Sequence, residues 1–210
     1  MERAAEKEPV TFTDLLRMRF KGILVPVAAF LNGLGLMPNT VTLLGLLGTV
    51  VGAYFLAIGN IPLGGIFILV AAPFDAVDGT MARLRGEPTA FGAFIDSVTD
   101  RYSELIIYGG LLVYFLQLQN WQGVVLTYLA AAGSLMVSYV RARAQGVGYE
   151  TKVGLLTRVE RFLILIPCLV LNIPIIGMAV MALLTNLTAF QRILHVRSQA
   201  YKQMGLGQKK

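Results

Sequence analysis

Charged residues are scarce in this sequence. Only 14% of its 210 residues are charged and 56% are hydrophobic, whereas soluble domains are about one quarter charged. Apolar runs make up most of the chain, which is more than one soluble core would bury. The composition therefore predicts an integral membrane protein.

Cysteine and histidine are also nearly absent. The one cysteine, Cys168, lies within an apolar run, which excludes an internal disulfide and any CxxC metal or redox motif. The one histidine, His195, is expected to contact lipid headgroups or to place a charge at a helix C-terminus rather than to take part in catalysis. The first twenty residues lack the apolar core and the cleavage site of a signal peptide.

Long apolar segments divide the chain into six candidate spans. A hydrocarbon core of about 30 Å needs about 20 helical residues. The spans are predicted at 40–59, 62–85, 90–116, 120–143, 156–172 and 174–196. We therefore expect an all-α integral membrane protein with one domain, 1–210, whose six-helix bundle covers 40–196. No internal repeat is visible, so the duplicated helices of many transporters find no support.

The segment before the bundle is expected to lie at the membrane surface. Within 11–21, apolar Phe12, Leu15, Leu16 and Phe20 share one helical face and basic residues take the rest, which predicts an amphipathic interfacial helix. A solvated tail is the alternative. Residues 22–36 are apolar but contain proline and glycine, so we expect a shallow or kinked entry segment there.

The distribution of charge predicts the orientation. The turns at 58–63, 117–123 and 171–176 contain no charged residue, whereas all 18 basic residues lie in the N-terminal segment or at the opposite helix ends. With six spans these basic regions share one side, which the positive-inside rule makes cytoplasmic. Both termini, including 1–21 and a tail at 197–210, are predicted in the cytoplasm at the plasma membrane. The net charge of +6 then fits anionic headgroups rather than nucleic acid.

Four aspartates lie within 26 residues. Asp75 and Asp78 are three residues apart, and Asp96 and Asp100 four apart, so each pair shares a helix face. The short turn at 85–89 predicts antiparallel neighbouring helices, which brings all four carboxylates together near the cytoplasmic side.

Such a cluster requires neutralisation. Two like charges about 4 Å apart repel by about 4 kcal/mol at an effective dielectric constant near 20. Oxygen ligands without nearby histidine or cysteine favour Mg²⁺ or Mn²⁺, and two such ions would balance four carboxylates and support phosphoryl chemistry. The alternative is a buried ionic network that only holds helices together, but ionisable residues within a membrane are usually functional.

Two glycines and one arginine accompany the aspartates. Gly79 follows Asp78, and Gly92 lies one turn before Asp96. Either glycine could admit a ligand close to the backbone or allow tight helix packing. Arg83 would pair with the acidic cluster or bind a phosphate.

The complete pattern resembles a known family signature. It reads Asp75-x-x-Asp78-Gly79-x-x-Ala82-Arg83, eight residues, then Gly92-x-x-x-Asp96-x-x-x-Asp100. This is similar, without a departure, to the signature of the CDP-alcohol phosphotransferases, also called CDP-alcohol phosphatidyltransferases. The expected six spans and interfacial helix resemble that family too, so the likeness covers most of the chain.

The resemblance implies a reaction and a set of roles. An alcohol would attack the lipid-linked phosphate of CDP-diacylglycerol, or of a CDP-archaeol-type lipid, and release CMP. Two ions, Mg²⁺ or Mn²⁺, would be held by Asp75, Asp78, Asp96 and Asp100, and Asp100 would also be the general base. The CDP-lipid would contact Asn39, Thr42, Gly79, Ala82, Arg83 and Gly92. A helix cap after Pro38 is an equally good explanation of Asn39 and Thr42. The family resemblance also implies a homodimer.

Three arginines at predicted cytoplasmic helix ends suggest the acceptor. Arg141, Arg158 and Arg192 could hold an anionic group, since arginine suits bidentate phosphate binding, or could be ordinary positive-inside residues. Their segments look similar to those of bacterial phosphatidylinositol-phosphate synthases, which implies an inositol phosphate acceptor. The chain departs from that group in having Arg141 for a lysine, Gln145 for a glutamate, and TRVER at 157–161 for ERPER. The alternative is the same reaction with glycerol-3-phosphate or another polar alcohol as the acceptor.

Two other classes fit less well. Membrane prenyltransferases also use aspartates and Mg²⁺, but resemble a longer bundle with two widely separated motifs. A cation transporter with an acidic site would need carboxylates near the midplane and a path to both faces, whereas the turns on the far side here are uncharged.

Overall fold

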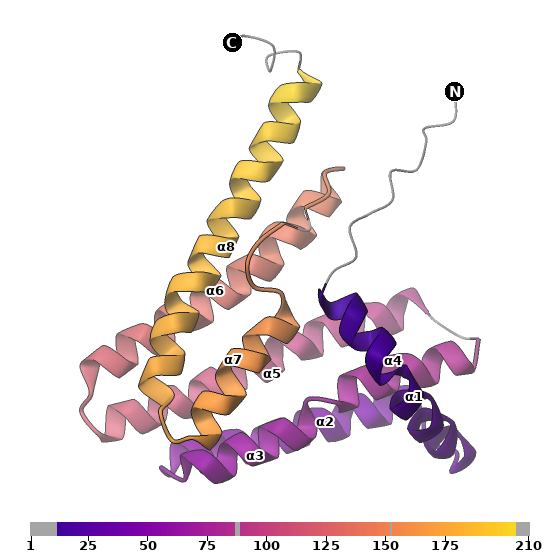
Figure 1. The fold of residues 1–210 in the computed structure, drawn as a ribbon, viewed down its shortest axis with the longest axis horizontal. Helices are drawn as coiled ribbons and strands as arrows, with labels where there is room; N and C mark the ends of the chain where they lie inside the picture. Colours follow the sequence, from indigo (N-terminus) through magenta and orange to yellow (C-terminus); the bar gives the residue numbers. More distant parts are fainter. Residues whose placement is uncertain (1–11, 87–88, 152, 205–210) are drawn as a thin grey trace.

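Eight helices make up the computed structural model, which describes residues 12–86, 89–151 and 153–204 (Figure 1). The described ranges contain no strand. The helices are α1 (Phe12–Gly33), α2 (Pro38–Ala57), α3 (Ile61–Ala71), α4 (Phe74–Leu84), α5 (Ala90–Gln117), α6 (Trp121–Gly146), α7 (Arg158–Val170) and α8 (Pro174–Gln203). The all-α prediction is confirmed.

Proline and glycine set the helix boundaries. α2, α3 and α8 each carry proline in their first turn, where the missing N–H has no partner to lose. The turn from α2 to α3 passes through Gly59 at a φ of 87°, a left-handed conformation that glycine adopts without a steric penalty. Short connections of this kind fold successive helices back on one another.

Helix α2 lies at the centre of one half of the molecule. It packs against α3, α4 and α5, whereas α6 packs against α5 and α8, and α7 against α3 and α8. Small residues permit close approach: a methyl group at Gly110 would lie only 2.5 Å from the carbonyl oxygen of Ala53. The buried core between the helices includes Leu56, Leu111 and Leu169. Helices α4 and α5 make few close backbone contacts with each other, and each packs against α2. Their predicted proximity is found at the acidic side chains, where Asp96 of α5 lies close to Asp75 and Asp78 of α4.

Every predicted span coincides with helical structure. Within the described part of the chain, four stretches are long and apolar enough to cross a membrane, judged by length and composition alone. They are Pro38–Ala57, Ile61–Leu84, Trp121–Gly146 and Pro174–Gln203. The second stretch includes α3 and α4, which are separated only at residues 72–73. Helix α5 has 28 residues but several charged side chains, and α7 has only 13 residues, or about 20 Å of helix. The chain is a multi-pass membrane protein, and its total of six spans stays a prediction.

The N-terminal part differs from the two segments expected. α1 runs without interruption from Phe12 to Gly33 and contains Pro26, so no boundary exists near residue 21. It packs against α4. At the other end, α8 continues to Gln203, so residues 197–203 of the predicted tail are helical. Residues 1–11 and 205–210 lie outside the described residues.

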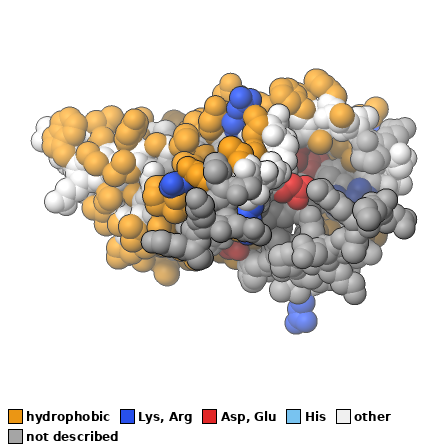
Figure 2. Space-filling model, turned by 90° about the horizontal axis from the view of Figure 1, so that it is seen from above, with side chains coloured by type: hydrophobic (Ala, Val, Ile, Leu, Met, Phe, Trp, Pro, Cys, Tyr) orange, Lys and Arg blue, Asp and Glu red, His pale blue; other side chains and the backbone are white. Residues whose placement is uncertain are grey.

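The helix ends separate by charge. The three uncharged turns lie together at the lower left of Figure 1, where Gly59 lies beside the Tyr114 ring and Gly65 packs on Leu169. The opposite helix ends face up and to the right (Figure 1). Figure 2 shows the molecule from above, where acidic and basic side chains gather over the middle and right, and hydrophobic side chains cover the left. This separation agrees with the predicted distribution of charge.

Candidate active site

The acidic residues stand near the starts of two helices. α4 begins at Phe74, which puts Asp75 in its first turn. α5 begins after Thr89, whose side-chain oxygen accepts the Gly92 N–H at 2.9 Å and so caps the helix, and Asp96 follows one turn after Gly92. Helix α2 packs on both α4 and α5 and thereby fixes the relative positions of the two acidic segments.

Three of the four predicted aspartates converge. Asp75, Asp78 and Asp96 each offer an oxygen, and these oxygens lie within 4.8 Å of one another. Asp78 is only 4% exposed and accepts a hydrogen bond from the Thr42 hydroxyl. This group consists of carboxylates alone, the donors that Mg²⁺ and Mn²⁺ prefer. The residues present therefore fit a divalent cation.

Asp100 lies at the margin of this group and is linked to it by an arginine. Its Oδ1 is 2.5 Å from Arg158 Nη1, and the same nitrogen is 2.6 Å from Asp75 Oδ2. Asp100 is 13% exposed. The structure therefore brings all four predicted aspartates into one neighbourhood, three of them directly and Asp100 through Arg158.

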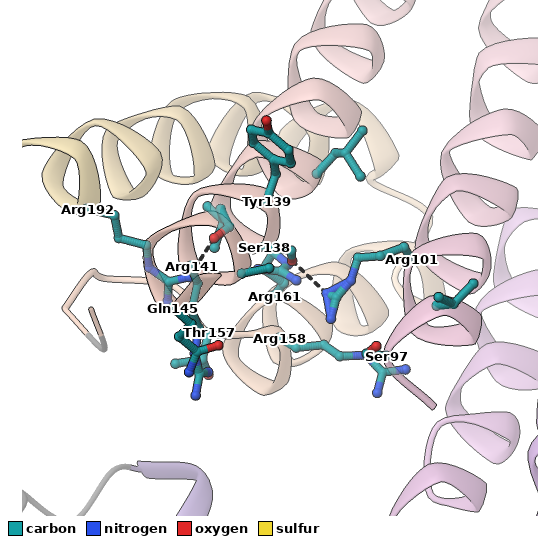
Figure 3. A pocket seen from close by; sticks show the side chains of 14 residues that line it. Ser97, Arg101, Ser138, Tyr139, Arg141, Gln145, Thr157, Arg158, Arg161 and Arg192 are labelled. Atoms are coloured by element: carbon teal, nitrogen blue, oxygen red, sulfur yellow. Dashed lines mark hydrogen bonds between the residues drawn. The ribbon is translucent and has the colours of Figure 1, made fainter. Parts of the chain in front are cut away.

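A cavity of about 440 Å³ lies beside the carboxylates and is lined by five arginines. They come from α5, α6, α7 and α8 and are Arg101, Arg141, Arg158, Arg161 and Arg192. Figure 3 shows Arg101 entering from one side and Arg141 and Arg192 from the other. The described lining contains no carboxylate. A concave surface with this many guanidinium groups is suited to a phosphate or another multiply charged anion.

The cavity arginines are held in different ways. Arg192 is 3% exposed and donates from Nη1 to the Val137 carbonyl at 2.6 Å and from Nε to the Val153 carbonyl at 2.9 Å. It therefore ties α8 to α6 and to the connection before α7. Arg101 donates to Ser138 Oγ at 2.6 Å. Arg141, at the end of α6, is exposed.

Sequence reasoning identified three of these arginines and missed Arg101, Arg161 and the carboxylate behind them. Glu104 is 6% exposed and lies 2.6 Å from Arg161 Nη2, and its Oε1 is 3.9 Å from Arg158 Nε. The spacing was available as a signal: Glu104 lies one turn after Asp100, and Arg161 one turn after Arg158. Arg161 lines the cavity, and Glu104 neutralises its charge from behind without itself entering the lining.

Thr42, which was predicted to contact the nucleotide, lies directly against the acidic group. It lies in the first turns of α2, and its hydroxyl contacts Asp78, so it connects α2 to the acidic group. Asn39, in the first turn of the same helix, is exposed. Met37, the residue before α2, makes no side-chain hydrogen bond that caps the helix.

The other predicted nucleotide residues lie along α4 and at the start of α5. A methyl group at Gly79 would contact only Arg83, at 3.6 Å or more, so none of the described helices packs closely on Gly79. At Gly92 it would meet only the capping Thr89 hydroxyl. Tight helix packing therefore does not explain either glycine. Arg83 is exposed and donates to Thr80 Oγ1 at 3.0 Å, and Ala82 is half-buried.

Comparisons with known proteins agree with this geometry. Residues 35–190 match the CDP-alcohol phosphatidyltransferase family. The archaetidylinositol phosphate synthase of Pyrococcus horikoshii is 35% identical over 185 residues, which is 88% of this chain and 96% of that protein.

Two solved structures of the phosphatidylinositol phosphate synthase of Mycobacterium tuberculosis share the fold. The structure with CDP-DAG bound matches with a TM-score of 0.78 and 31% identity, covering 83% of this chain and 93% of that one. The complex with manganese and citrate matches with a TM-score of 0.78 and 30% identity, covering 83% and 89%. The acidic motif, the helical fold and these matches lead to one conclusion: the chain belongs to the CDP-alcohol phosphatidyltransferase family, a family of membrane transferases of phospholipid biosynthesis.

Proposed function

We propose that this protein transfers a phosphatidyl or archaetidyl group from a CDP-activated lipid to a small phosphorylated alcohol, inositol phosphate in the first instance, and releases CMP. The observation that carries the proposal is the contact between two opposite charge clusters. A group of carboxylates suited to divalent ions adjoins a cavity lined by five arginines, and Arg158 touches both. A phosphorylated acceptor in the cavity would have its hydroxyl beside the reacting phosphate.

The acidic group would hold two Mg²⁺ or Mn²⁺ ions through Asp75, Asp78, Asp96 and Asp100. The manganese complex of the mycobacterial relative supports a divalent ion, and four carboxylates balance two of them. When bound, the ions would supply positive charge to the diphosphate of the CDP-lipid.

Asp100 stands where the two clusters meet, which suits the general base. Its carboxylate would accept the proton of the acceptor hydroxyl as that oxygen attacks the lipid-linked phosphorus, and the bond to CMP would break. Arg141, Arg158 and Arg192, with Arg101 and Arg161, would hold the acceptor phosphate. Positioning by these groups would supply much of the rate enhancement.

The CDP-lipid would enter along α4. The relative with CDP-DAG bound supports such a substrate. The open backbone at Gly79 would admit the nucleotide, with Ala82, Arg83 and Gly92 beside it and with Asn39 and Thr42 facing it from α2.

The topology proposed with this function has six spans in one domain, 1–210. The bundle at 40–196 would put the charged helix ends, the active site and both termini in the cytoplasm at the plasma membrane. The first part of α1 would lie in the interface. A homodimer is proposed from the family resemblance.

The test is CMP release by the purified protein with Mg²⁺ or Mn²⁺. CDP-diacylglycerol and CDP-archaeol are each paired with inositol phosphate, glycerol-3-phosphate, free inositol or serine. We expect turnover with inositol phosphate and none with free inositol or serine, because these two lack the phosphate that the arginines bind. A preference for glycerol-3-phosphate would mean that this compound, and not inositol phosphate, is the acceptor. A preference for unphosphorylated alcohols would overturn the proposal that the cavity binds the acceptor phosphate.

A further inference from the structure

Arg158 contacts both halves of the candidate active site. Its Nη1 lies 2.6 Å from Asp75 Oδ2 and 2.5 Å from Asp100 Oδ1. The same side chain lines the arginine cavity, where its guanidinium carbon lies 5.4 Å from the centre of the Phe162 ring. Of the other cavity arginines, Arg161 pairs with Glu104 and Arg192 with backbone carbonyls. Arg101 lies 3.6 Å from Asp100 Oδ2, at longer range than Arg158, and donates to Ser138. Arg158 is thus placed to respond to both clusters.

Divalent ions and Arg158 would compete for the same carboxylate oxygens. The proposed function assigns Asp75 and Asp100 to the ions. A guanidinium in contact with a carboxylate oxygen repels a second cation at short range, which weakens that oxygen as a ligand. The cavity next to Arg158 offers its long side chain a second position, which an anion would favour.

We propose that Arg158 couples metal binding to acceptor binding, an inference that rests on the proposed function. Ions at the carboxylates displace its guanidinium from Asp75 and Asp100 toward the cavity, where it donates to the acceptor phosphate. An anion in the cavity draws Arg158 away from the carboxylates and so raises their affinity for the ions. By linkage, each ligand raises the affinity for the other by the same factor.

The experiment measures Mn²⁺ binding to the purified full-length protein without CDP-lipid, by the electron paramagnetic resonance signal of free Mn²⁺. Inorganic phosphate is the anion, and a protein-free titration corrects for its own Mn²⁺ complex. We expect phosphate to lower the Mn²⁺ dissociation constant at least about fivefold, the lower end of ordinary coupling. Mn²⁺ should tighten phosphate binding by the same factor. Equal Mn²⁺ affinities with and without phosphate would overturn the proposal in the unmodified protein.

The Arg158→Gln variant distinguishes this coupling from simple electrostatic attraction between the bound phosphate and Mn²⁺. The variant should bind Mn²⁺ more tightly than the parent without phosphate, because no guanidinium competes for Asp75, and phosphate should no longer change that affinity. Unchanged or weaker Mn²⁺ binding, or a full phosphate effect, would contradict the proposal.

Arg141→Gln is the matched control, since Arg141 lines the same cavity and forms no ion pair with a carboxylate among those described. It should leave Mn²⁺ affinity without phosphate unchanged. An equal gain in Mn²⁺ affinity in this variant would assign the effect to the general field of the arginines and overturn a specific role of Arg158. CMP release identifies which idea has failed: turnover without coupling removes only this inference, whereas absence of both turnover and Mn²⁺ binding removes the proposed function.

Discussion

The carboxylate group and the arginine cavity are built in different ways. The aspartates lie between residues 75 and 100, on two consecutive helices, at helical spacings. The cavity arginines lie between residues 101 and 192 and come from four helices. The acidic group is therefore encoded locally, whereas the cavity exists only after α6, α7 and α8 have packed.

The two regions also balance charge differently. The carboxylates meet in a small volume, where Arg158 contacts Asp75 and Asp100 and Arg101 lies 3.6 Å from Asp100, which suits a site that accepts further cations. The arginines are distributed around a larger cavity, and three of them are anchored by Glu104, Ser138 or backbone carbonyls. Substitutions in the first region should therefore affect the chemical step, and those in the second should affect folding or acceptor binding.

The largest effect is expected at the junction of the two regions. Asp100→Asn should lower turnover by about 100-fold or more, because general base catalysis contributes about 10²–10⁴ in rate, and CDP-lipid binding should remain measurable. The measurement is CMP release together with equilibrium binding of CDP-diacylglycerol. Glu150→Gln, at an exposed carboxylate outside the cavity lining, is the control and should keep near-normal turnover. Turnover of Asp100→Asn above a few per cent of the parent would refute its role as base.

The second largest effect is expected on the stability of the protein, when the ion pair of Glu104 and Arg161 beside the cavity is broken. Glu104→Gln leaves Arg161, which is 3% exposed, without its charged partner, and should lower the free energy of unfolding by about 3 kcal/mol, since breaking a buried ion pair typically costs about 3–5 kcal/mol. Denaturant unfolding in detergent measures this change. The double variant Glu104→Gln with Arg161→Gln removes both charges and should recover part of the loss. If the single and the double variant were equally stable, the pairing of Glu104 with Arg161 would have no specific role in stability.

Prediction from sequence succeeded where the chain itself fixes the geometry. The spacings within the two aspartate pairs, together with the short turn at 85–89, were sufficient to predict that Asp75 and Asp78 meet Asp96. Apolar length was sufficient to locate the helical segments of the bundle, but it did not predict the division of 62–85 into α3 and α4. The predicted proximity of α4 and α5 holds at their carboxylates but not along their backbones, because a short connection does not reveal that both helices pack on α2. Glu104 and Arg161 were missed because their pairing joins α5 to α7, and no local spacing reports contacts between distant helices.

A smaller effect is expected for a single cavity arginine. Arg141→Ala should raise the acceptor KM about tenfold, equivalent to about 1.4 kcal/mol of binding free energy, with little change in the KM for the CDP-lipid. Arg143→Ala is the matched control: it removes an exposed cation from the same helix end, outside the cavity lining. Steady-state kinetics with each substrate varied in turn distinguish the outcomes. Equal changes for both substrates, or for both variants, would indicate general electrostatics instead of a phosphate site.

The smallest effect tests the nucleotide side of the acidic region. Gly79→Ala adds a methyl group that meets only Arg83, so the variant should be at least as stable as the parent. It should raise the CDP-lipid KM several-fold, because the methyl group occupies space that the nucleotide requires. Gly109→Ala, in α5 with nothing within 4 Å of the added group, controls for the gain in helix propensity of about 1 kcal/mol and should not change that KM. Gly133→Ala, by contrast, would place its methyl group 2.1 Å from Thr185 Oγ1 and should destabilise the fold. A loss of stability in Gly79→Ala without a change in CDP-lipid KM would make Gly79 a packing residue like Gly133, and the nucleotide would then have to approach the carboxylates along another surface.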